Sequence, residues 1–184
     1  VTKTGYITVV NAGAQSCDTL SNLYNADTLT YYQLSNGYTG YVTGNNSLGD
    51  LAMAEYYPNT TTAQVTGVLF YFIKAISPLP ASHTITVKVW DATGTGGTPG
   101  TVLASQSRTI SSLSTTGITS VTFTTPPTVT GDFFVGYDLP TASGDTVTVV
   151  STLFSSPAPD YGYNQWDDQT WHLFSDTYGA GNDL

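Results

Sequence analysis

Apolar and polar residues alternate in short runs along this chain, which is the pattern of β-strands. Between residues 84 and 90, Ile85, Val87 and Val89 alternate with polar neighbours, as expected for a strand with one buried face. The segment 65–76 is apolar at neighbouring positions as well, which favours a central strand covered on both faces. No long stretch repeats with the 3.6-residue spacing of an amphipathic helix. The pattern therefore predicts an all-β protein.

Runs of β-branched and aromatic residues, separated by Gly, Pro, Asn and Asp, predict about eleven strands. The predicted strands are 5–10, 28–34, 38–42, 51–57, 65–76, 84–90, 101–109, 117–124, 132–137, 146–153 and 164–174. Many short strands joined by turns are typical of two packed antiparallel sheets. We expect a single domain, residues 1–184, folded as a two-sheet antiparallel β-sandwich of the jelly-roll kind, with residues 1–13 as an N-terminal arm or donor strand.

The charge content restricts the partners of this protein. Only 9% of the residues are charged, whereas about 25% is usual for a soluble domain. Four Lys and Arg residues against thirteen Asp and Glu residues give a net charge of -9, which disfavours nucleic acids and anionic membranes. The longest apolar run, 68–73, is too short to span a bilayer. A surface of Thr, Ser, Asn, Tyr and Gly suits a secreted protein at a cell surface, and the absence of a signal peptide favours a processed product or an excised domain.

The residues that usually perform catalysis are scarce. The chain has two histidines, one cysteine and one glutamate, and it contains no nucleophile elbow, zinc-binding helix or phosphate-binding loop. A glycosidase needs two carboxylates across a cleft, but the adjacent Asp167 and Asp168 would point to opposite faces of a strand. Glu55 paired with an aspartate remains the one hydrolase alternative, and Cys17 is interpreted as an idle thiol. The sequence thus predicts a protein without catalytic activity.

Oxygen-donor residues gather in three turn regions and could hold a calcium ion. The loop 44–50 contributes Asn45 and Asp50, Asp91 opens a second loop, and Asp167 lies in a third. Calcium takes six to eight oxygen ligands from such loops, although the spacing here is not that of an EF-hand. The alternative is that these residues only shape turns.

Thirteen tyrosines and three tryptophans could line a glycan-binding face. Trp90 ends the alternating strand on the face opposite to its valines, and Tyr163 and Trp166 lie together near the C-terminus. Trp166 and Trp171 flank residues 167–170, which resemble the turn of a tight hairpin. Core packing and cross-strand pairing are the alternative roles of these rings.

Several segments together resemble a domain of large secreted and surface proteins of the Bacteroidetes, which often lies beside a type IX secretion signal. They are SCDTLSN (16–22), GYVTGNNSLGDLAMAEY (40–56), TITVKVWD (84–91), TPGTVLASQ (98–106) and NQWDDQTW (164–171). The resemblance covers most of the chain and implies a jelly-roll sandwich, export and a non-catalytic accessory role. The C-terminal sorting domain typical of such proteins is not in this sequence.

Short sequence patterns also indicate glycosylation. Thr19, Thr28 and Thr146 each follow an aspartate and precede an aliphatic residue, which resembles the O-glycosylation pattern of secreted Bacteroidetes proteins. Asn45 and Asn59 match the loose acceptor pattern for N-glycosylation.

The leading functional hypothesis is a non-catalytic, extracellular structural or adhesive subunit at a bacterial surface, whose partners are copies of itself or other surface proteins. An assembly arm centred on Tyr6, Ile7, Val9 and Val10 could pair with an open sheet edge of the next subunit and build a filament. The alternative for the arm is that it forms the first strand of its own sheet. The alternative function is a carbohydrate-binding module of a secreted polysaccharide-degrading system.

Overall fold

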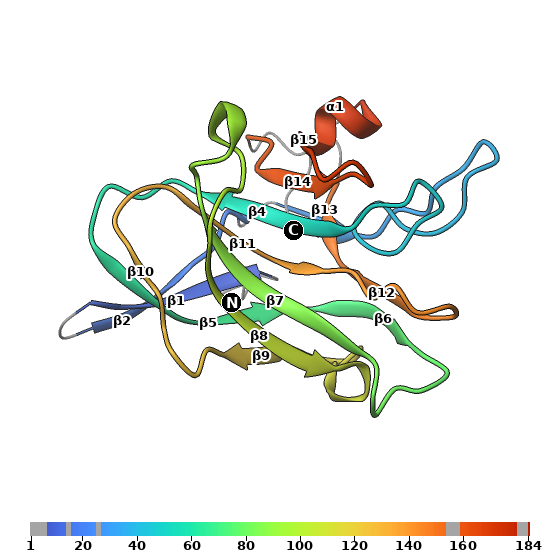
Figure 1. Cartoon of the computed structure of the whole chain (residues 1–184), viewed down its shortest axis with the longest axis horizontal. Helices are drawn as coiled ribbons and strands as arrows, with labels where there is room; N and C mark the ends of the chain where they lie inside the picture. Colours follow the sequence, from blue (N-terminus) through green and yellow to red (C-terminus); the bar gives the residue numbers. More distant parts are fainter. Residues whose placement is uncertain (1–6, 14–15, 25–26, 154–158, 180–183) are drawn as a thin grey trace.

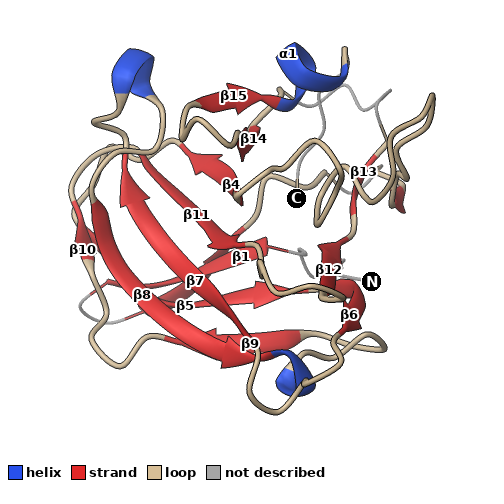
Figure 2. Cartoon of the chain, turned by 45° about the vertical axis from the view of Figure 1, so that its right-hand side comes forward, coloured by secondary structure: helices blue, strands red, loops and turns tan. Residues whose placement is uncertain are grey.

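The computed structural model describes residues 7–13, 16–24, 27–153, 159–179 and 184, with side chains from residue 18 onward. Two antiparallel sheets lie face to face, and short helical segments occupy the periphery (Figures 1 and 2). Strand accounts for 45% and helix for 7% of the residues, so the predicted all-β sandwich is confirmed. None of the helices in the described ranges is long and apolar enough to cross a membrane.

The first sheet is built around β5 (Ala63–Phe70). On one side β5 pairs with β1 (Ile7–Gly13), which in turn pairs with β2 (Ser16–Leu20). On its other side β5 pairs with β9 (Thr119–Thr122) and with β10 (Thr128–Val129). Because β5 is paired on both sides, the sequence prediction of a central strand in this region is confirmed.

The second sheet has six strands in the order β15-β14-β4-β11-β7-β8, all antiparallel to their neighbours. Their bounds are β4 Ala52–Tyr57, β7 Thr84–Asp91, β8 Val102–Thr109, β11 Phe133–Asp138, β14 Gly162–Gln165 and β15 Trp171–Leu173. The helical segments are η1 (Thr95–Gly97), η2 (Ile110–Ser112) and α1 (Phe174–Tyr178). The end strands β8 and β15 each have one neighbour in the sheet.

Two short pairings extend the first layer. After an interruption at Tyr71, β5 continues as β6 (Phe72–Ile76), which pairs with β12 (Thr146–Val149). Strand β13 (Ser151–Thr152) then pairs with β3 (Leu29–Thr30). The chain therefore changes layer repeatedly. Strands β3, β5, β9 and β12 lie in the first layer, and between them the chain crosses to the second layer for β4, then for β7 and β8, and then for β11. Together with the order β4-β11-β7-β8, this is the connectivity of a jelly roll.

The main core lies between the two layers and consists largely of residues that strand alternation turns inward, with Ile110, Leu113, Phe174 and Leu184 added from outside the strands. The six-stranded sheet contributes Met53, Tyr57, Ile85, Val87, Val89, Val135 and Tyr137, and the other layer contributes Val65, Val68, Phe70, Phe72, Val121 and Val147. A smaller apolar cluster covers the outer face of the six-stranded sheet, where Trp90, Phe134 and Ala54 are buried. The sheet is thus apolar on both faces near its centre.

Glu55 is a buried charge within the fold. Its side chain is fully buried, its Oε1 accepts a hydrogen bond of 2.8 Å from the Asn22 side chain, and its Oε2 accepts one of 3.0 Å from the Leu184 amide. A buried carboxylate is tolerated only when such donors compensate for its lost hydration. Glu55 therefore ties the segment after β2 and residue 184 to the middle of β4.

Several strand boundaries differ from the sequence prediction. Residues 38–42 form isolated bridges and turns instead of a strand, because their backbone bonds go to neighbouring loop residues. Strands β2 and β10 were not predicted, and the predicted strand 65–76 is divided at Tyr71. The segment 164–174 is a hairpin, β14 and β15, that leads into α1, so the predicted turn at 167–170 is confirmed.

Candidate functional site

The loop 39–50, which leads into β4, forms a compact platform at one end of the sandwich (Figure 1). Its backbone is fixed to β12 by a bond of 3.1 Å from the Asn45 amide to the Val147 carbonyl. Thr43 is fully buried, and its hydroxyl donates to the Val149 carbonyl at 2.6 Å. Gly44 lies so close to this strand that a Cβ would stand 2.2 Å from the Val147 oxygen. The platform is therefore held rigidly against the first layer.

Asp50, at the end of this platform, is the centre of a buried hydrogen-bond network. Its Oδ1 accepts from the Asn164 side chain at 3.1 Å, and its Oδ2 accepts from Asn46 at 2.8 Å and from the Tyr178 hydroxyl at 2.9 Å. The donors come from the platform, from β14 and from α1. Burial, followed by the nearby Asp50 carboxylate, raises the pKa of Tyr178, so its hydroxyl remains a donor. Asp50 thus connects three separate parts of the chain.

The four residues predicted to hold calcium do not form one cluster. Asn45 uses both side-chain atoms to tie the platform to residues 140 and 147, and both Asp50 oxygens accept the bonds given above. Asp91 shapes its own turn: burial opposes its ionisation, but hydrogen bonds from Thr93 and Thr101 outweigh this and lower its pKa. No group of three or more His, Cys, Asp or Glu side chains that could hold a metal occurs within the described ranges.

The turn between β14 and β15 presents Trp166 at the surface. Asp168 Oδ1 accepts hydrogen bonds from the Thr170 amide at 2.9 Å and from its hydroxyl at 2.5 Å, which fixes the turn and lowers the Asp168 pKa. Trp166 and His172 stack with ring centroids 3.5 Å apart and planes 18° apart. One face of the indole is therefore supported by the imidazole, while 37% of the residue remains exposed.

A cleft of 270 Å³, here called the Trp166 cleft, lies between this turn, the platform and α1. It is lined by Leu48, Asp50, Trp166, Asp167 and Thr177. Leu48 is 39% exposed and adds apolar surface, whereas Asp167 is an exposed carboxylate. The Thr177 hydroxyl donates to Asn164 at 2.9 Å and keeps its lone pairs as acceptors. The cleft thus places an aromatic ring beside several hydrogen-bonding groups.

The other two residues predicted to bind glycan lie in the outer apolar cluster. Trp90 does face away from the main core, as its strand alternation predicted, but it is only 4% exposed. Trp171 covers it in an edge-to-face contact with centroids 5.5 Å apart. Tyr163 is half-buried and packs edge-on against Phe134 at 5.2 Å. The structure therefore does not bring Trp90 and Tyr163 into the Trp166 cleft.

A second concave region, here called the long groove, consists of three adjoining clefts. The first, of 410 Å³, lies on the outer face of the six-stranded sheet and contains Lys88, Asp138 and Gln165. The second, of 700 Å³, lies between the platform and residues 140–146, and the third, of 260 Å³, contains Tyr38. The first and second clefts share Leu51, Pro140 and Thr141, and the second and third share Thr39, Gly40 and Tyr41.

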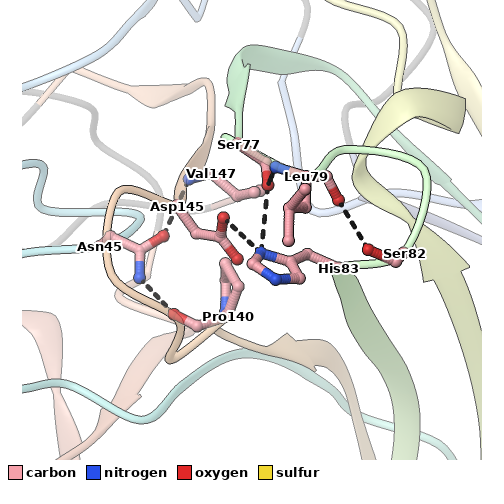
Figure 3. Close-up of polar contacts among 8 residues, drawn as sticks. All are labelled: Asn45, Ser77, Leu79, Ser82, His83, Pro140, Asp145 and Val147. Carbon is pink, nitrogen blue, oxygen red and sulfur yellow. Dashed lines mark hydrogen bonds and ion pairs between the residues drawn. The ribbon is translucent and has the colours of Figure 1, made fainter.

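Side chains beneath the second cleft hold its two walls together (Figure 3). Asn45 donates to the Pro140 carbonyl at 2.8 Å and accepts from the Val147 amide at 2.8 Å. On the other side, His83 Nδ1 lies 2.9 Å from Asp145 Oδ1 and 3.2 Å from Ser77 Oγ. A catalytic triad uses both ring nitrogens, one toward the acid and one toward the serine. Here both contacts are made by Nδ1, so these three side chains have the geometry of a structural contact between neighbouring segments.

The remaining predicted sites fall in several places. Tyr6 lies outside the described residues, while Ile7, Val9 and Val10 belong to β1, which pairs with β5 of the same chain. Thr19 and Thr28 are exposed and Thr146 is half-buried on β12. The side-chain amide of Asn45 is engaged in the bond to Pro140.

Sequence reasoning missed the long groove, the Asp50 network and the contact between His83 and Asp145. Two of the three partners of Asp50 are 114 and 128 residues away along the chain, and His83 and Asp145 are 62 residues apart. The one available signal was the density of amide and hydroxyl residues in the loop 39–50, which was interpreted as turn and metal chemistry. Comparison of the chain with family models, with curated proteins and with solved structures gave no match.

Proposed function

We propose that this protein is a non-catalytic, extracellular β-sandwich that acts by binding carbohydrate at a bacterial surface, and that the Trp166 cleft is its binding site. The observation that carries the proposal is the exposed indole of Trp166, supported from behind by His172 at 3.5 Å. Aromatic rings provide large apolar contact area with little conformational entropy to lose. A sugar ring, which has apolar C–H groups on its faces, fits such a support.

The surroundings of Trp166 favour a sugar over other ligands. Leu48 extends the apolar surface, while Asp167 and Thr177 offer oxygen acceptors for hydroxyl donors. Among the described residues neither a lysine nor an arginine lines the cleft, and phosphates and nucleic acids require such cations. The low charge of the whole chain agrees with a ligand recognised by hydrogen bonds and stacking.

A polysaccharide pull-down tests this proposal. The intact protein is mixed with insoluble glucan, mannan, xylan and chitin, and the bound fraction is measured. At least one of these polymers is expected to retain the protein, and Trp166→Ala is expected to abolish retention. Tyr24→Ala is the matched control, because Tyr24 is 53% exposed and lines none of the clefts described above. The proposal fails if no polymer retains the protein, or if Trp166→Ala binds as well as Tyr24→Ala.

Self-assembly by strand pairing is a second candidate function, favoured by the position of β1. This strand lies along β5 with Ile7 opposite Phe70 and Val9 opposite Val68. If β1 of one copy left this place, β5 could accept the same strand from a neighbouring copy. Deletion of residues 1–10 separates the alternatives, because it removes most of the strand. If the truncated protein forms filaments as readily as the intact chain, exchange of the arm is excluded.

A further inference from the structure

We propose that the long groove binds an internal stretch of an extended, uncharged polysaccharide. The Trp166 cleft alone would hold a short piece of sugar, whereas three adjoining clefts offer a continuous path. This inference rests on the proposed carbohydrate-binding function and specifies its ligand: a polymer chain instead of a terminal sugar.

The continuity of the groove follows from the residues that its clefts share. Leu51, Pro140 and Thr141 line both the first and the second cleft, and Tyr41 lines both the second and the third. A ligand that occupies one cleft can therefore extend into the next without leaving the surface. The path adjoins the Trp166 cleft at Asp50, which lines both the second cleft of the groove and the Trp166 cleft.

The lining of the groove matches the chemistry of a chain of hydroxyl groups. Amide side chains and hydroxyls occur along it, among them Ser47, Thr141 and Gln165. Tyr38, which is 54% exposed, provides an aromatic surface at the far end. Asp145 also belongs to the wall of the second cleft, but its side chain is only 1% exposed and contacts His83.

The charged groups along the groove indicate the class of polysaccharide. Lys88 and Asp138 neutralise each other in an ion pair of 2.5 Å. Asp50 is surrounded by three hydrogen-bond donors, and Asp145 lies against His83. No charged residue occurs between positions 28 and 49, the segment that carries Tyr38 and Tyr41. Lys88 is the only cation among the described residues that line the groove, and it is already paired, so a polyanion would meet carboxylates and the groove favours a neutral polymer.

Calorimetry with oligosaccharides of increasing length tests the inference. The probes are a disaccharide, a tetrasaccharide and a hexasaccharide of the neutral backbone that binds best in the pull-down, and an oligogalacturonate as the anionic counterpart. We expect the hexasaccharide to bind at least about tenfold more tightly than the disaccharide, which corresponds to about 1.4 kcal/mol. The oligogalacturonate is expected to bind at least about tenfold more weakly than the neutral hexasaccharide.

Three variants identify the residues that make longer oligosaccharides bind more tightly. Tyr38→Ala and Thr141→Val should remove the advantage of the longer probes and leave disaccharide binding unchanged, since both side chains are exposed and lie outside the Trp166 cleft. Trp166→Ala should weaken every probe. Equal affinity at all lengths, equal binding of the anionic probe, or unchanged length dependence in both groove variants would overturn the extended site. If Trp166→Ala has no effect on any probe, the proposed function itself fails, which is a different result.

Discussion

Removal of the Tyr178 hydroxyl tests whether the Asp50 network holds the candidate site together. Tyr178 donates a 2.9 Å hydrogen bond to Asp50 Oδ2, and α1 contributes no other hydrogen bond to this carboxylate among the described residues. Tyr178→Phe deletes that donor without opening a large cavity. A hydrogen bond to a charged group contributes about 1.5–3 kcal/mol, which is the predicted loss in the free energy of unfolding. For a chain of this size the corresponding drop in Tm is about 3–12 °C.

Urea unfolding followed by tryptophan fluorescence measures this loss, provided that the slope of the transition stays constant. Tyr24→Phe removes a hydroxyl from a residue that is 53% exposed and serves as the control. In an Asp50→Asn background the remaining Tyr178 bond is between neutral groups, so Tyr178→Phe should then cost only about 0.5–1.5 kcal/mol. If Tyr178→Phe stays within about 0.5 kcal/mol of the intact protein, as surface substitutions do, the network does not hold the site.

Three further predictions concern the six-stranded sheet. Gly136→Ala should destabilise the fold by about 1–3 kcal/mol in the same urea assay, because the new Cβ would stand 1.9 Å from the Met53 carbonyl oxygen; a neutral result would show that the strands can separate. Burial, followed by the hydrogen bond to Asp132, raises the pKa of Tyr56 to about 12, so Asp132→Asn should lower it toward 10 without reaching it, as measured by ultraviolet titration of the tyrosines. Because this folded pKa lies above the unfolded value, the contribution of Tyr56 to stability is complete below pH 10 and is lost as the pH rises through about 12. Over that pH interval the Tyr56→Phe variant should therefore lose less stability than the intact protein. An identical loss in both proteins would contradict the assignment of this pKa to Tyr56. Glu55→Ala should cost about 1–3 kcal/mol for each buried donor that loses its acceptor, here the Asn22 side chain and the Leu184 amide. Retention of full stability would mean that Glu55 is not buried in solution.

The layered fold could be predicted because strand alternation is a local signal. Ile85, Val87 and Val89 are all at most 1% exposed, and the side of the sheet that each faces follows from its position in the strand. The same reasoning placed Trp90 on the opposite face correctly. It did not predict that Trp90 is buried, because the covering ring of Trp171 comes from a hairpin 81 residues further along the chain.

The loop 39–50 shows why the candidate site could not be predicted. Residues 38–42 contain aromatic and β-branched side chains, which favour a strand when considered alone. In the structure these residues bond to neighbouring loop residues, as in the 2.9 Å bond from the Tyr41 amide to the Asn45 carbonyl, and Tyr38 is 54% exposed. The amides of Asn45 and Asn46 likewise serve structural bonds that only the folded chain assembles. Sites built from distant loops leave no periodic trace in the sequence.

The crystal structure of the protein soaked with the neutral hexasaccharide is the most direct test of carbohydrate binding. A sugar ring is predicted to lie parallel to the exposed face of the Trp166 indole, with carbon atoms about 4 Å apart. The remaining sugars should follow the groove past Gln165 and Thr141 toward Tyr38. An oligosaccharide ordered elsewhere on the protein, or a bare Trp166 at saturating concentrations of a sugar that binds in solution, would contradict the account.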